Sequence, residues 1–156
     1  MIRLDPMTHA DLGPFEEHDI LEYAAEQTRG GFWSEAEAIE RSRQEHKKLL
    51  PDGLATKNHF LYTIQDADQG RAVGALWLMV NLDSPRPSGF ILDLEIDEPY
   101  RRKGYGRAAM LELERLARGM GLRQLGLNVF AHNAGARALY ESLGYGLGSL
   151  NMLKDL

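Results

Sequence analysis

A helical pattern of polar and apolar positions occupies the first third of the chain. Residues 8–50 have this pattern, which breaks at Gly30-Gly31. Ser34 followed by Glu37 has the spacing of a capping box, a common start of a helix. The pattern therefore predicts two helices, the second running from 35 to about 49.

Strand patterns dominate the middle of the chain. Residues 2–6 could already form a short strand, and residues 60–64, 72–80 and 90–97 follow as strand-like runs. The turn-rich residues 66–70 between the first two of these runs predict a hairpin. In the last run Leu92, Leu94 and Ile96 alternate with Asp93, Glu95 and Asp97, the period of two expected of a half-buried strand.

The last third alternates between strands and helices. A glycine-containing loop opens a helix through Met120, and residues 124–130 form another strand pattern. Asn133 then caps a helix that Gly144 ends. Two strand-like segments, near 145–147 and 149–154, follow that helix. Together these elements predict an α+β fold with a mixed sheet.

Length and composition narrow the class of protein. A chain of 156 residues suits one domain, 1–156, and 44% hydrophobic with 26% charged residues is typical of globular proteins. A net charge of -5 gives no basic footprint for a nucleic-acid partner. The longest apolar stretch, 73–80, is too short for a bilayer, and no signal sequence precedes it, so we expect a cytoplasmic protein without a membrane partner.

The chain also lacks the side chains of several kinds of site. It has no cysteine, which removes disulfides, cysteine-ligated zinc and a cysteine nucleophile. Its five histidines form no close ligand pair, so we expect no metal site.

The loop at 101–106 has the chemistry of an anion site. Gly104 and Gly106 allow the backbone to approach a ligand, and the free N–H groups of the helix that follows favour negative charge. Arg101, Arg102 and Lys103 add positive charge at the same place. A pyrophosphate group would suit this loop.

Two other interpretations of the loop are open. It could be a surface loop with a glycine-softened helix start. It also matches a Rossmann dinucleotide fingerprint formally, as Gly104-x-Gly106-x-x-Ala109. Against the fingerprint, the match follows apparently antiparallel strands, and 128–130 holds no ribose-binding acid.

Two motifs at a fixed distance resemble the GNAT superfamily of acyl-CoA-dependent N-acyltransferases. The first is Arg101-x-x-Gly104-x-Gly106, which is similar to the pyrophosphate loop of that family. The second is Leu125-x-Leu127-x-Val129-x-x-x-Asn133-x-x-Ala136-x-x-Leu139-Tyr140-x-x-x-Gly144-Tyr145. The resemblance implies a mixed, mostly antiparallel sheet of six to seven strands flanked by about four helices. It also implies acetyl transfer from acetyl-CoA to a primary amine by direct attack in a ternary complex.

The resemblance assigns roles to individual residues. The backbone N–H of Ile96 would stabilise the oxyanion, and Asn133 would contact the pantetheine arm besides capping its helix. Tyr140 would be the proton donor near the thioester sulfur, although its apolar helix face also suits a packed aromatic side chain. The residues expected to bind coenzyme A are Ile96, Arg101, Arg102, Lys103, Gly104, Tyr105, Gly106 and Asn133.

The residue that accepts the proton of the amine is less defined. Members of the family often supply a carboxylate about six residues before Ile96, but Phe90 stands there in this chain. We therefore choose Glu95 first and Asp93 second as the base, and interpret Asp97 as part of a solvated strand face. A water chain without a single base is an alternative.

The acceptor and the partners remain open from the sequence. A small-molecule or peptide amine is expected, walled by residues 16–34 and 77–88 according to the resemblance, and a homodimer is compatible with the sequence. Glu16, Glu17, Asp19, Glu22 and Glu26 could attract a cation or form a solvated helix face. The alternative function is a non-catalytic acyl-CoA-binding module; the phenol of Tyr140 favours the enzyme.

Overall fold

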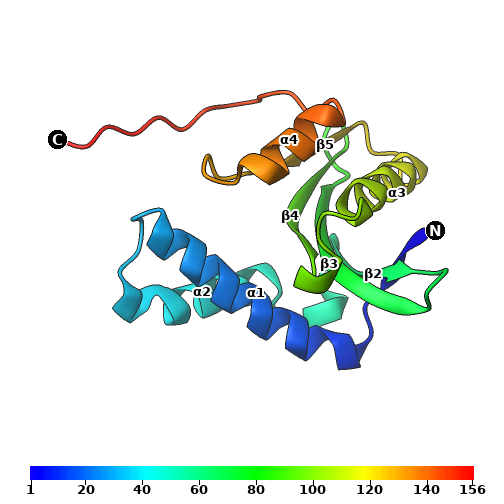
Figure 1. Cartoon of the computed structure of the whole chain (residues 1–156), viewed down its shortest axis with the longest axis horizontal. Helices are drawn as coiled ribbons and strands as arrows, with labels where there is room; N and C mark the ends of the chain where they lie inside the picture. The colour runs from blue at the N-terminus through cyan, green and yellow to red at the C-terminus, as the bar shows by residue number, and fades with distance from the viewer.

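In the computed structural model, which describes residues 1–156, a five-stranded sheet separates α1 and α2 from α3 and α4 (Figure 1). The predicted α+β fold with four main helices is confirmed. The strands are β1 (Ile2–Pro6), β2 (His59–Asp66), β3 (Arg71–Asn81), β4 (Ser88–Ile96) and β5 (Gln124–Leu127). The helices are α1 (His9–Arg29), α2 (Glu35–Leu49), α3 (Tyr105–Gly119) and α4 (Ala134–Ser142), with short 3₁₀ turns at Gly53–Ala55 and Glu98–Tyr100.

The strands lie in the order β1-β2-β3-β4-β5. The pairs β1–β2, β2–β3 and β3–β4 are antiparallel, and the pair β4–β5 is parallel. The sheet is therefore mixed and mostly antiparallel, as expected. β4, α3 and β5 form one parallel βαβ unit, but the other strands are antiparallel, unlike the parallel sheet of a dinucleotide-binding fold.

The two late strands were predicted wrongly. Residues 143–156 contain no strand, so the sheet has five strands rather than six or seven. The apolar residues near 147–153 have strand character, but a strand exists only when another strand pairs with it. No segment of the chain pairs with this one, which extends away from the body (Figure 1).

The helix starts agree with the sequence in position but not in every capping contact. Ser34 is the N-cap of α2, yet its side chain makes no capping hydrogen bond, so the predicted capping box does not form. In α1 the carboxylate of Asp11 accepts hydrogen bonds from both the N–H and the hydroxyl of Thr8. No helix combines the length and the apolar character needed to cross a bilayer.

A bulge in β4 interrupts the predicted alternation. Trp77 pairs with Asp93 and Leu78 with Ile91, so Leu92 is the extra residue of β4. Leu92 consequently packs in a cluster with Trp77 on the α1 side, whereas Leu94 packs in the main core.

The main core lies between the sheet and α3. Its buried side chains include Ile64, Leu76 and Leu78 from the strands and Met110 and Leu113 from α3. A smaller cluster, which includes Phe15 and Trp77, fills the space between α1 and the sheet. Both faces of the central strands are therefore covered, and the polar side chains of β4 point into the α1 side.

Candidate active site

The start of α3 presents a row of free backbone donors. None of the backbone N–H groups from Arg102 to Arg107 donates a hydrogen bond within the chain; the first bond of the helix runs from the N–H of Ala108 to the oxygen of Gly104. Gly104, the N-cap of α3, has a φ of 86°, a left-handed conformation that favours glycine. Unbonded donors at a helix N-terminus form an anion site.

The three basic residues of the loop differ in their availability. Arg101 donates to the oxygen of Ile96 (2.8 Å) and to Glu95 Oε1 (2.9 Å), and Lys103 donates to the oxygen of Pro99 (2.8 Å). Arg102 forms no hydrogen bond or ion pair within the chain. Arg102 is therefore the loop cation that is free to bind a ligand.

The aromatic residue of the loop has a structural contact. The hydroxyl of Tyr105 donates to Asp66 Oδ2 at 2.7 Å, and this hydrogen bond lowers the pKa of Asp66. The side chain of Tyr105 thus fastens the start of α3 to the end of β2. Only its backbone N–H belongs to the row of free donors.

Beyond Ile91, β4 has no neighbour on its β5 side. β5 pairs with β4 only from Ser88 to Ile91. The N–H of Asp97 donates to the oxygen of Val73 on β3 (2.9 Å), and antiparallel pairing alternates the direction of successive N–H groups. The N–H of Ile96 therefore points away from β3, toward the opening between β4 and β5. This orientation suits the oxyanion role expected of it.

Tyr140 lies on α4 at the same opening. Its ring packs against the main core, and its centroid lies 6.0 Å from the centroid of the Tyr145 ring. Burial, together with the charge of Asp93, raises the pKa of Tyr140 to about 12. The phenol is therefore protonated at neutral pH and can donate a hydrogen bond.

Asp93 stands among like charges. Burial raises its pKa well above the ordinary value of 3.8, and the carboxylates of Asp19, Glu95 and Glu26 raise it further. A carboxylate with a raised pKa holds a proton more strongly, which is the property required of a base that works near neutral pH.

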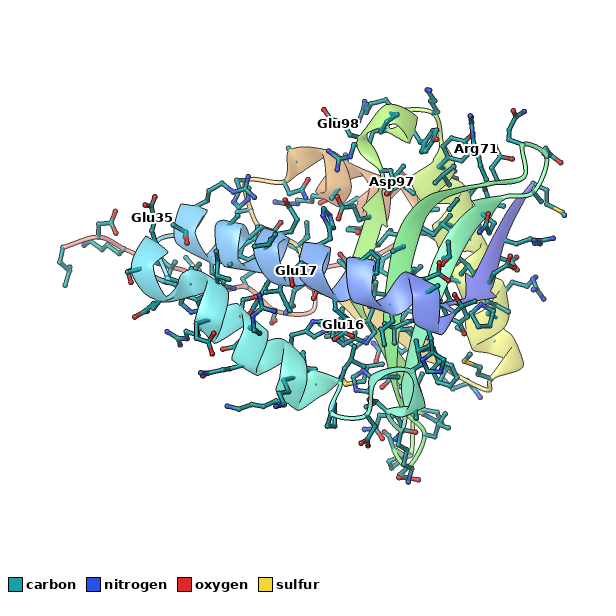
Figure 2. All side chains as sticks on the ribbon, turned by 90° about the horizontal axis from the view of Figure 1, so that it is seen from below. Glu16, Glu17, Glu35, Arg71, Asp97 and Glu98 are labelled. Atoms are coloured by element: carbon teal, nitrogen blue, oxygen red, sulfur yellow. The ribbon has the colours of Figure 1, made fainter.

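Glu95, two residues along the strand, has both carboxylate oxygens engaged. His18 Nε2 lies 2.6 Å from Oε2, and Arg101 donates to Oε1. These three side chains line a hollow of about 380 Å³ with Glu22, Asp97 and Glu98. Figure 2 shows Asp97 and Glu98 beyond the end of β4, with α1 crossing in front of the strands.

Residues 18–145 of the chain match the family model of the acetyltransferase (GNAT) family. The chain belongs to this family. It is 37% identical to the uncharacterized N-acetyltransferase YycN of Bacillus subtilis over 99% of both chains, and 34% identical to YdgE of the same organism over 98% of this chain and 97% of YdgE. The crystal structure of YycN aligns over 100% of this chain and 99% of its own with a TM-score of 0.96.

A shorter similarity is to an acetyltransferase whose name states its acceptor. The [ribosomal protein bS18]-alanine N-acetyltransferase of Escherichia coli is 42% identical over 55 residues, which is 35% of this chain and 37% of that protein. Among solved structures, an acetyltransferase fold from Pyrococcus furiosus aligns over 100% of this chain with 22% identity and a TM-score of 0.64, which concerns the fold alone.

The GNAT residues expected from the sequence converge on the opening between β4 and β5. The loop at 101–106, the N–H of Ile96, Asp93 and Tyr140 all border it. Asn133 is the N-cap of α4, as predicted, and its Oδ1 accepts from the N–H of Ala136 at 3.2 Å. Its contact with a pantetheine arm stays a prediction.

Sequence reasoning missed His18, and it left open whether Glu26 attracts a cation or belongs to a solvated helix face. His18 contacts Glu95 across 77 positions of sequence, and no local pattern signals that pairing. Glu26 on α1 has a raised pKa, mainly because it is partly buried. The charges of Glu22 and Glu95 raise this pKa further, whereas those of Arg29 and His132 lower it. The acids of α1 were a visible signal, but a charged helix face is usually solvated.

Proposed function

We propose that the protein transfers an acetyl group from acetyl-CoA to a primary amine by direct attack in a ternary complex. The row of free N–H groups at the start of α3, beside an opening that Asp93 and Tyr140 border, carries this proposal. Family membership supports the reaction class, and the residues below give it a mechanism.

The start of α3 has the donors that coenzyme A requires. The N–H groups of residues 102–107 would hold the pyrophosphate, with Arg102 adding its charge, and Gly106 leaves the approach clear of a side chain. Asn133 and the N-terminus of α4 would lie along the pantetheine arm. When bound, acetyl-CoA supplies the activated acetyl thioester.

The N–H of Ile96 is the donor for the acetyl oxygen. This oxygen gains negative charge during attack, and a fixed backbone donor stabilises that charge without reorganisation. The backbone N–H of Leu94 points in the same direction as that of Ile96, because the two residues are two positions apart on the antiparallel strand. It therefore also faces the opening.

Asp93 is the better base on geometric grounds, which reverses the order that the sequence favoured. The amine, with an ordinary pKa of about 10.4, must lose a proton before it attacks. The oxygens of Glu95 already accept from Arg101 and face His18, whereas the raised pKa of Asp93 makes its carboxylate a stronger proton acceptor. Glu95 would then act by raising the pKa of Asp93.

Tyr140 would stabilise the departing sulfur by donating a hydrogen bond. A simple thiol has a pKa of about 8.5, so complete transfer of a proton from a phenol of pKa about 12 is uphill by about 5 kcal/mol. A hydrogen bond lowers the charge on the sulfur without that transfer. The sulfur can then take its final proton from solvent or from the amine.

The acceptor proposed is a small-molecule or peptide amine that approaches protonated. The carboxylates of Asp19, Glu22 and Glu26 lie on the α1 side of the opening, where they favour a cation. The partial similarity to an enzyme that acts on a ribosomal protein alanine makes an N-terminal α-amine one class to include.

The test is release of coenzyme A from acetyl-CoA in the presence of amines. The panel contains lysine-like amines, N-terminal peptide amines, polyamines and aminoglycosides, and mass spectrometry identifies acetylated products. We expect release that depends on one of these classes. Tight acetyl-CoA binding without turnover for any amine would support the non-catalytic acyl-CoA-binding module instead.

A further inference from the structure

Residues 146–156 form an apolar tail without a partner. The tail leaves α4 as an extended segment (Figure 1), contains no helix or strand, and makes no hydrogen bond with the rest of the chain. Its large apolar side chains are nevertheless numerous and open to solvent. The exposed fractions are 66% for Leu147, 70% for Leu150, 86% for Met152 and 71% for Leu153.

The same molecule has an unpaired strand edge. β5 is the last strand of the sheet and pairs with β4 on one side only, so its other side presents free backbone donors and acceptors. A groove of about 650 Å³ lies beside β5. Its apolar lining includes Leu122, Leu125, Leu143 and Tyr145.

We propose that the tail of one copy of this chain pairs with β5 of a second copy and fills its groove, while the second tail does the same in return. Each copy supplies one unpaired extended tail and one unpaired strand edge, so a two-fold exchange leaves neither free. The backbone of the tail gains the ladder hydrogen bonds that it lacks, and its apolar side chains leave water.

The path of the tail favours a second copy over return to its own edge. Tyr145 and Gly146 still line the groove of their own chain, and the segment that follows leaves the groove and extends away from the body (Figure 1). An extended tail that leaves the groove of its own chain is the form that an exchange between copies requires.

The first experiment measures the mass of the protein in solution by light scattering coupled to gel filtration. We expect twice the mass of one chain. Leu150→Asp combined with Met152→Asp should halve it, because charged side chains cannot enter the groove, whereas Ile39→Asp on the exposed face of α2 should leave it unchanged. A monomeric wild-type protein, or a tail variant that stays dimeric, would overturn the proposal.

The second experiment distinguishes exchange from return to the same chain. The protein has no cysteine, so Gln124→Cys with Met152→Cys introduces one thiol at the edge of β5 and one in the tail. A short bis-maleimide should then join two chains, seen as a covalent dimer after denaturation, and Ile39→Cys with Met152→Cys should give none. Cross-linking within a single chain would show that the tail returns to its own β5, and would overturn the proposal.

Discussion

Two carboxylates on β4 show how neighbouring residues of one strand acquire different chemistry. Glu95 has Arg101 and His18 at its two oxygens, and Asp93 is buried among other acids. The sequence placed both on one strand face and favoured Glu95 over Asp93. Their ranking depends on His18 and Asp19 of α1, which lie far away in the sequence, so it could not have been predicted from the strand itself.

Asp93→Asn should lower kcat by roughly 10²–10⁴-fold, the range for removal of a general base, while acetyl-CoA binding is retained. In the wild type, activity should rise with pH through the raised pKa of Asp93, because the base must be deprotonated. Steady-state kinetics from pH 5 to 9 on folded protein measures both effects.

Glu95→Gln is the matched comparison on the same strand. It removes one of the charges that raise the pKa of Asp93, so the acidic limb of the profile should move to lower pH while most of the rate is kept. A large loss of rate in Glu95→Gln, with Asp93→Asn active, would return the role of base to Glu95. If neither variant loses activity, solvent takes the proton.

Tyr140→Phe should lower kcat by roughly 10- to 1000-fold and leave the Kd for coenzyme A nearly unchanged, because it removes a donor to the sulfur but keeps the ring. Tyr145→Phe is the control, since that neighbouring phenol is also partly buried, with a pKa raised to about 12. Equal activity of wild type and Tyr140→Phe would assign Tyr140 to packing alone.

At the scale of elements, the sequence predicted most boundaries well. The glycine-ended helices and the strands of the antiparallel half follow from local periodicity, and α2 begins and ends where its pattern does. The strand predicted for 124–130 ends at Leu127, where its pairing with β4 ends. The strands predicted near 145–147 and 149–154 are absent for the same reason. Strand pairing depends on a partner segment, which the local periodicity of a sequence does not specify.

Gly106→Val tests the junction of β4 and α3. A Cβ at residue 106 would lie 3.3 Å from Leu139 Cδ2, and a branched side chain would extend into the approach to the free N–H groups. We expect the Kd for coenzyme A to rise at least about tenfold, measured by calorimetry, since several charge-assisted hydrogen bonds would be disturbed.

Gly119→Val is the control for that substitution. It lies at the other end of α3, where an added Cβ meets nothing within 4 Å, and it carries a similar change in helix propensity. Circular dichroism establishes that both variants fold. Equal affinities for coenzyme A in the two variants would contradict the placement of the pyrophosphate at this helix start.

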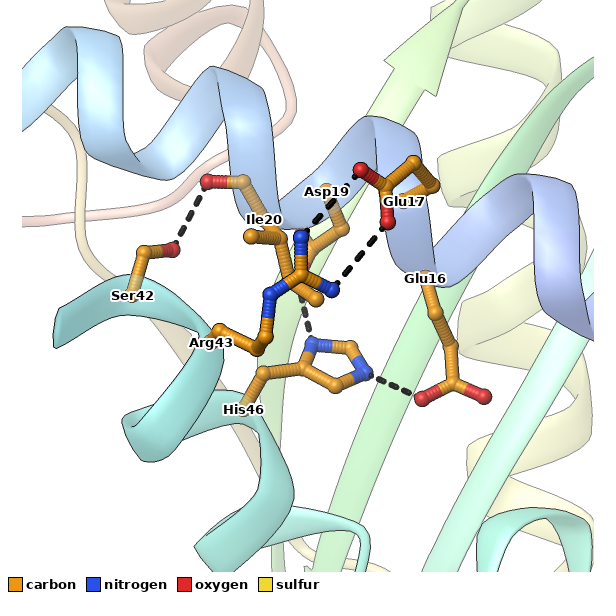
Figure 3. A network of polar contacts seen from close by, with 7 residues as sticks. All are labelled: Glu16, Glu17, Asp19, Ile20, Ser42, Arg43 and His46. Atoms are coloured by element: carbon orange, nitrogen blue, oxygen red, sulfur yellow. Dashed lines mark hydrogen bonds and ion pairs between the residues drawn. The ribbon is translucent and has the colours of Figure 1, made fainter. Parts of the chain in front are cut away.

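At the scale of the whole molecule, a polar network joins α1 to α2 (Figure 3). The ring of His46 on α2 lies 2.9 Å from both Asp19 Oδ2 and Glu16 Oε2 of α1. It also packs against Trp77 of β3, with ring centroids 5.3 Å apart. Asp19 in turn raises the pKa of Asp93, so the network reaches the opening between β4 and β5.

His46 should make the stability of the fold depend on pH. Burial lowers its pKa, but Asp19 and Glu16 together more than offset this, and the net pKa is raised above 6.5. A group whose pKa is higher in the folded state stabilises the fold when it is protonated in both states. The stabilisation is therefore complete below about pH 6.5 and is lost as pH rises through the raised pKa.

The measurement is the free energy of unfolding in urea at several pH values from 5.5 to 9, for wild type and His46→Gln. The informative quantity is the difference between the two proteins, which removes the contribution of every other titrating group and should shrink as pH rises. His9→Gln, at an exposed position on α1, should show no such trend. A difference that is constant with pH would mean that His46 is held as a neutral ring, and that its hydrogen bonds and its packing on Trp77, rather than its charge, join the helices to the sheet.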